Sequence, residues 1–169
     1  MAITIQVDNA AALASLRRLE GVPIRSKLLS AVRNTINDGK QEARARIIAR
    51  YTAKSPLALG KTRSRVSGLT GTLTFSGKRN QIKKFQINPR RRINPAPKGG
   101  VFAQIVKGAG GNLSRAFLLN NGAVMERVGR PRLPIKNIKT IALPGMAKAV
   151  KDYVLRKMDQ TLERSLQAL

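Results

Sequence analysis

The sequence contains no cysteine, no histidine and no tryptophan, and only 4% of its residues are aromatic. The absence of cysteine excludes disulfides and thiolate chemistry, and the absence of histidine removes the commonest general base and the commonest metal ligand. With so few aromatic residues, a core must be built mainly from leucine, isoleucine, valine and alanine. We therefore expect that the protein is not an enzyme and that it binds no cofactor and no metal.

The chain has 169 residues, of which 42% are hydrophobic, and this is enough for one globular domain with a buried core. We accordingly expect a single domain over residues 1–169. The first residues, MAITIQVDNA, carry no basic stretch of the kind that opens a secretion signal, and no apolar run is long enough to cross a bilayer. We expect a soluble protein that is not secreted and has no membrane partner.

Acidic residues are the other scarce class, since 8 Asp+Glu against 33 Lys+Arg give a formal net charge of +25. Such a surplus exceeds what solubility needs and opposes compaction through self-repulsion. No acidic residue occurs between Glu42 and Glu126, whereas basic residues are frequent throughout that interval. The middle of the chain is therefore expected to lie against something anionic.

The densest basic cluster lies within residues 88–100, which read NPRRRINPAPKGG. Its prolines and glycines are unsuited to a helix or an inner strand, so we expect an exposed loop or arm. Guanidinium groups bind phosphates in a forked geometry and release condensed counterions when they do so. The expected contacts with nucleic acid or with an acidic partner are Arg79, Lys83, Lys84, Arg90, Arg91, Arg92 and Lys98.

Nothing in the sequence points to a device that reads bases. It has no zinc-ligand spacing and no RNA-recognition aromatic stretch. A helix-turn-helix stays open as an alternative, but no recognition helix stands out. The four phenylalanines lie singly in strand-like runs, where a core role is favoured over base stacking. Any DNA contact should therefore be made through the backbone and be indifferent to sequence. An acidic protein partner, or a face exposed to solvent, remains an alternative for the basic stretch.

Two amphipathic helices are predicted. The first begins near Pro23 and runs to about Arg50, with apolar residues at a spacing near 3.6 and with Gly39 as either a kink or a point of close packing. The second follows Pro144-Gly145 and continues to the end of the sequence. A shorter helix is expected to end at Leu19.

Strand-like runs lie between these helices and before them. Residues 69–75 and 81–88 are interpreted as a hairpin, and residues 108–112 as a turn or flexible tip. The further strands are expected at residues 3–7, 101–107 and 116–119. The predicted fold is α+β, with one mostly antiparallel sheet of about four to five strands packed by the two helices and with the basic loop extending from it.

Two pairs of carboxylates have the i,i+4 spacing that could hold a cation on a helix, namely Asp38 with Glu42 and Asp159 with Glu163. Basic residues surround both pairs, so surface ion pairs such as Glu42 with Arg46 are the favoured interpretation. This reinforces the expectation of no metal site.

A series of short motifs follows in the last part of the chain: RAFLLNNG at residues 115–122, VMERVGR at 124–130, LPI at 133–135 and IALP at 141–144. Their order resembles the minor tail protein Z family, the tail completion proteins of long-tailed phages. In that family an AF strand and a short turn lead to a V-M-x-R strand, then to P-I and to a proline before the terminal helix. The similar part covers residues 101–150, and the first hundred residues match more loosely.

The resemblance implies a structural protein of the virion, assembled in the host cytoplasm and located in the neck of the tail. It would form a ring, expected as a hexamer, at the head-proximal end of the tail. Its partners would be the tail terminator or tail tube, the head-tail connector and the end of the packaged double-stranded DNA. A ring of six copies would gather about 150 formal positive charges around the DNA channel.

The same motifs include a predicted hairpin, because apolar residues alternate on either side of Asn121-Gly122. An interface role and an ordinary core role are both open for this hairpin. The residues expected at a subunit interface are Phe117, Leu119, Val124, Met125, Arg127, Arg130 and Arg132. The alternative function is a free, sequence-nonspecific nucleic-acid-binding protein, which the charge alone favours.

Overall fold

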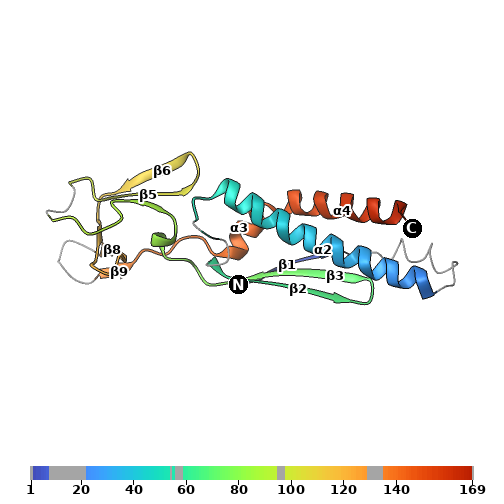
Figure 1. Cartoon of the computed structure of the whole chain (residues 1–169). Coiled ribbons are helices and arrows are strands. Elements are labelled where there is room, and N and C mark those ends of the chain that lie inside the picture. Colours follow the sequence, from blue (N-terminus) through green and yellow to red (C-terminus); the bar gives the residue numbers. More distant parts are fainter. Residues whose placement is uncertain are drawn as a thin grey trace. The chain divides into compact units, whose positions relative to one another are not determined.

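The structure is a computed structural model that describes residues 2–7, 22–53, 55, 59–94, 98–128 and 135–168 (Figure 1). Its internal contacts divide the chain into two compact units. Unit 1 comprises Met1–Arg46, Lys61–Gly77 and Pro144–Leu169, and unit 2 comprises Ile47–Gly60 and Lys78–Leu143. The expectation of one domain over residues 1–169 stays a prediction.

Unit 1 contains a three-stranded antiparallel sheet in the order β1-β3-β2. Its strands are β1 (Ala2–Val7), β2 (Lys61–Ser67) and β3 (Thr70–Ser76). On the inner face of the sheet, Ile5, Leu73 and Phe75 are buried. The central strand alternates between buried and half-buried residues, as expected for a strand with one face on a core.

The long helix α2 (Val22–Arg50) covers that inner face (Figure 1). Its buried stripe includes the predicted positions Leu28, Val32, Ile36 and Ala43. Contact with β3 is close, since a Cβ built on Gly71 would lie 2.5 Å from Cγ1 of Ile36. A glycine is therefore needed at this position of the strand for the helix to approach the sheet.

The C-terminal region forms α3 (Leu143–Ala149) and α4 (Lys151–Gln167), which are separated at Val150. The predicted C-terminal helix is thus present, but it is interrupted once. In unit 1, α4 packs on α2, where a Cβ built on Gly39 would lie 2.6 Å from Sδ of the fully buried Met158. Of the two roles considered for Gly39, the structure shows close packing.

The described part of unit 2 contains two further three-stranded antiparallel sheets and the 3-10 turn η2 (Ile82–Lys84). One sheet, in the order β4-β5-β6, is formed by Gln86–Asn88, Val101–Val106 and Ala109–Leu113. The other, in the order β7-β8-β9, is formed by Ala116–Leu118, Val124–Arg127 and Ile135–Asn137. Both sheets contribute to one apolar cluster, which consists of Ile82, Ile87, Val101, Ala103, Ala116, Leu118 and Val124.

The α+β class is confirmed, whereas the single sheet of four to five strands is wrong. Among the described residues three small sheets form instead, because the strands from β4 onward pair only with strands next to them in the sequence and the stretch with η2 lies between β3 and β4. The predicted pairing of residues 69–75 with 81–88 is also wrong. Strand β3 pairs with the preceding β2 across a tight turn at Gly68, whose φ is +57°, and residues 82–84 form η2.

Two other local predictions can be compared with the structure. Residues 108–112 are more than a flexible tip, because β6 pairs with β5 along this stretch. The hairpin around Asn121-Gly122 is confirmed by the pairing of β7 with β8, although β9 adds a third strand. The short helix expected to end at Leu19 lies outside the described residues.

Candidate polyanion or acidic-partner interface

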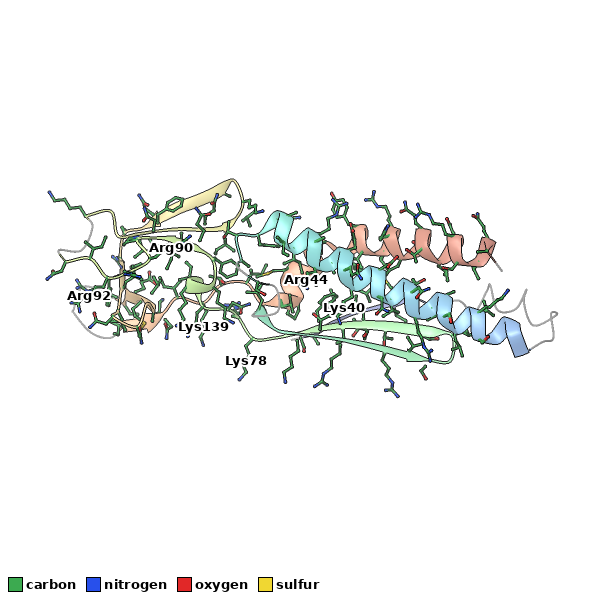
Figure 2. All side chains as sticks on the ribbon, viewed as in Figure 1. Lys40, Arg44, Lys78, Arg90, Arg92 and Lys139 are labelled. Atoms are coloured by element: carbon green, nitrogen blue, oxygen red, sulfur yellow. The ribbon has the colours of Figure 1, made fainter. Side chains whose placement is uncertain are left out.

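The basic loop begins where β4 ends. Every described side chain from Arg90 to Asn94 is exposed, as is Lys98, while residues 95–97 of the predicted loop lie outside the described part. Exposure of the consecutive Arg90, Arg91 and Arg92 leaves their guanidinium groups accessible to an anion. Figure 2 labels Arg90 and Arg92 in this part of unit 2.

The base of the loop borders an open hollow of about 620 Å³. Arg90 and Arg91 line it together with Phe102 of β5 and Asn88 of β4. Phe102 lies opposite Asn88 in the sheet and above Gly110 of β6, where a Cβ would be 2.5 Å from the ring. The hollow is therefore lined by two exposed arginines, an exposed asparagine and a half-buried phenylalanine.

One hydrogen bond ties the basic loop to the hairpin. Arg92 Nη1 donates to Asn120 Oδ1 at 3.1 Å, and Asn120 lies in the turn between β7 and β8. The same turn is closed by the backbone N–H of Ala123, which donates to Asn121 Oδ1 at 3.0 Å. The third arginine of the loop is thus held by its contact with Asn120, and this contact could not be predicted from the sequence.

A second basic group precedes β4. Arg79 and Lys83 are exposed, whereas Lys84 is half-buried and donates from Nζ to Asn80 Oδ1 at 3.0 Å. Asn80 is buried, and its Nδ2 donates to the backbone oxygens of Leu59 and Ile141, each at 3.2 Å. A buried amide therefore anchors the segment that presents these cations. Lys78 and Lys139 extend from the same unit (Figure 2).

The predicted interface residues lie in different environments. Val124 is 2% exposed and belongs to the core of unit 2, while Leu119 and Met125 are half-buried. Phe117 is also half-buried, and the guanidinium carbon of Arg127 lies 5.4 Å from its ring centre. The other two predicted interface residues, Arg130 and Arg132, lie outside the described residues. A subunit interface at this hairpin stays a prediction.

The carboxylate pairs behave as helix-surface groups. Glu42 Oε1 accepts from Arg46 Nε at 2.7 Å, which confirms the ion pair expected between these two residues. Asp38 Oδ2 accepts from Thr161 Oγ1 at 2.9 Å, and the ion-pair interpretation of Asp159 with Glu163 stays a prediction. Arg46 also lies over the ring of Tyr153, with its guanidinium carbon 4.7 Å from the ring centre. In the part of the chain that the structure describes, no three acidic residues gather as a possible metal site.

The cations of β2 were not among the contact residues predicted from the sequence. Lys61, Arg63 and Arg65 are all exposed on this edge strand. Their alternation with Thr62 and Ser64 has the period of two that marks a strand. This alternation could have indicated a strand in the sequence. It was not interpreted so, because the residues between the cations are polar and not apolar.

None of the described helices is long and apolar enough to cross a membrane. Comparisons with protein-family models, with curated proteins and with solved structures each found no match. The functional conclusion is therefore drawn from the charge, the exposure of the cations and the resemblance of the motifs.

Proposed function

We propose that the protein is a structural tail completion protein of a long-tailed phage. It forms a ring, expected as a hexamer, at the head-proximal end of the tail. There it joins the tail to the connector and lines or borders the DNA channel. The observation that supports this function is a large surplus of exposed cations that the chain itself does not neutralise.

The acidic residues of the chain balance only a small part of its positive charge. Of the 8 acidic residues, Glu42 and Glu126 form ion pairs, with Arg46 and Lys136 respectively. Both pairs are at least partly exposed, and exposed pairs contribute only about 0–1 kcal/mol each. The remaining repulsion is reduced when the cations face an anionic neighbour. In a ring around DNA, the genome and acidic neighbouring rings both supply one.

A ring also agrees with the presence of two different candidate contact surfaces on the chain. Ring contacts are heterologous, so that one patch of a subunit meets a different patch of the next. The hairpin formed by β7 and β8 offers one such patch, with Phe117 and Met125 half-buried on it. The loop cations Arg90 and Arg91 are left for the channel or for an acidic neighbour.

A free nucleic-acid-binding protein is the second candidate. The hollow beside the basic loop favours it, because Phe102 lines the hollow together with Arg90 and Arg91. Such a combination binds the bases and phosphates of single strands without sequence preference. This candidate needs no ring, and the two functions therefore predict different oligomeric states.

Sedimentation velocity of the purified chain at low and high salt, with and without duplex DNA, tests the proposed ring. The proposal predicts a closed oligomer of defined size, expected as six copies, in at least one of these conditions. Electron microscopy of that species should show a ring with a central opening. A chain that remains monomeric in every condition and does not join isolated phage tails would contradict the tail function.

A further inference from the structure

The sheet of unit 1 has a second face, which points away from α2. The pairing register places Lys61 beside Ser76, Arg63 beside Thr74 and Arg65 beside Thr72. On the other side of β3, Thr4 lies beside Thr74 and Gln6 beside Thr72. Because side chains alternate along each strand, all these residues project to the same side. We call this surface the outer face; its members are Ala2, Thr4, Gln6, Lys61, Arg63, Arg65, Ser67, Thr70, Thr72, Thr74 and Ser76.

The composition of the outer face is uniform. Among its described residues none is acidic, and Ala2 is the one apolar member. The rest carry a hydroxyl, an amide, an ammonium or a guanidinium group. The structure shows no ion pair of Lys61, Arg63 or Arg65 with another described residue. Figure 2 shows long side chains with nitrogen tips extending from β2 on the side away from α2.

The inner face fixes the position of the outer one. Leu73 and Phe75 alternate with Thr72, Thr74 and Ser76 along β3, and both are buried against the core. A slip of one residue in the register would bury the polar series and expose the apolar one, so the register is strongly specified. The cations of β2 are therefore held on one surface.

We propose that the outer face binds the phosphate backbone of duplex DNA. Arginine, lysine, serine, threonine and glutamine are the side chains that contact phosphates in protein–DNA complexes. Alternate residues of a strand are about 6.8 Å apart, so Lys61, Arg63 and Arg65 form a row of three cations about 14 Å long. Their long, exposed side chains can each reach a phosphate of a DNA backbone that runs along this row.

An acidic protein is the less suitable occupant. The buried centre of a protein–protein interface is enriched in aromatic residues and methionine, and the outer face offers neither. A DNA backbone needs charge and hydrogen-bond donors without an apolar centre. The assignment goes beyond the proposed tail function, since it concerns a surface of unit 1 and requires no ring.

A purely protective role is the main competing explanation. Charged residues on an edge strand prevent pairing with the edge of another sheet. Under that explanation, removal of the cations would promote self-association and leave DNA affinity unchanged. DNA binding predicts a change in affinity and in its salt dependence.

The test compares two full-length variants that each lose two arginines and one lysine from exposed positions of unit 1. The first carries Lys61→Gln, Arg63→Gln and Arg65→Gln, and the control carries Arg33→Gln, Lys40→Gln and Arg164→Gln. Duplex affinity is measured by fluorescence anisotropy over a range of salt concentrations. Far-UV circular dichroism checks that both variants fold.

We expect the outer-face variant to lower the steepness of log K against log salt by about 0.9 for each lost phosphate contact. Three contacts thus reduce the slope by about 2.7, and the control should leave it unchanged. Equal slopes in the two variants would overturn the proposal. So would a variant that aggregates while its slope stays that of the unaltered chain.

A second measurement needs no substitution. Lysines of the unaltered protein are acetylated with and without duplex DNA, and each site is quantified by mass spectrometry. We expect DNA to protect Lys61 several-fold more than the exposed Lys40 of α2. Equal protection of the two lysines would contradict the proposal. Stronger protection of Lys61 by polyglutamate than by duplex at the same salt would assign the face to an acidic protein.

Discussion

The substitution Gly71→Ala tests the packing that holds the outer face in place. A Cβ at this position would lie 2.5 Å from Cγ1 and 2.7 Å from Cδ1 of Ile36. Carbon atoms in contact prefer about 3.5–4.0 Å, so α2 or the sheet must move by roughly 1 Å. Ile36 is 2% exposed, and a β-branched side chain in a helix has one strongly preferred rotamer. It therefore has little freedom to turn away.

Two opposing terms set the size of the effect. Overpacking of this kind costs about 1–3 kcal/mol, whereas replacement of glycine by alanine inside a strand recovers about 0.5–1 kcal/mol. We expect the free energy of unfolding to fall by about 0–2.5 kcal/mol. Urea unfolding followed by far-UV circular dichroism measures it, because the helical signal comes mainly from unit 1.

Gly111→Ala is the control for alanine at an uncrowded strand glycine, since Gly111 also lies in a strand but has no atom within 4 Å of a built Cβ. It should leave stability unchanged or raise it slightly. Because Gly111 belongs to unit 2, the unfolding of this variant is followed by differential scanning calorimetry and not by the helical signal of unit 1. In the double variant Gly71→Ala/Ile36→Ala, the new methyl group occupies part of the space that isoleucine left. The two losses should therefore sum to more than the loss in the double variant. An increase in stability for Gly71→Ala alone would refute the described contact between α2 and β3.

Two further predictions concern a helix–helix contact within unit 1 and a buried hydrogen-bonded amide within unit 2. Gly39→Ala gains about 1 kcal/mol of helix propensity, but the new methyl group meets Met158. The free energy of unfolding measured in urea should therefore fall slightly or stay constant. An increase of the full amount, about 1 kcal/mol, would mean that α2 and α4 do not touch at this position. Asn80→Ala leaves the backbone oxygens of Leu59 and Ile141 without the amide that donates to them. The free energy of unfolding, measured by thermal unfolding, should therefore fall by about 1–3 kcal/mol. An unchanged melting temperature would contradict the anchoring role of Asn80.

The elements that could be predicted from the sequence are those whose determinants are local. The long helix was expected near residues 23–50 and is observed at Val22–Arg50, because its apolar stripe persists over many turns. The hairpin at Asn121-Gly122 was also predictable, since Gly122 adopts a φ of +72° that other residues rarely accept. Exposure of the arginine loop followed from its prolines and glycines.

Strand pairing could not be predicted in the same way. Strand β2 has cations at alternate positions and lacks the alternating apolar residues that indicate a strand. Strand β6 begins with Ala109-Gly110-Gly111, a sequence that is typical of a turn. The partner of β3 depends on which residues α2 buries, and that is a property of the packed unit. The outer face of the sheet was missed for the same reason, because it exists only once β2 is placed beside β3.

The most direct test of the central claim is the salt dependence of DNA binding by the unaltered protein. Affinity for duplexes of unrelated sequence is measured between about 50 and 200 mM salt, a range over which six to ten phosphate contacts would change it by about 10³–10⁵-fold. The account predicts a steep fall with the same slope for every sequence. A weak dependence on salt, or no measurable binding to any duplex at the lowest salt, would contradict the proposal that the outer face binds DNA and would leave acidic neighbouring proteins as the counter-charge of the surplus cations.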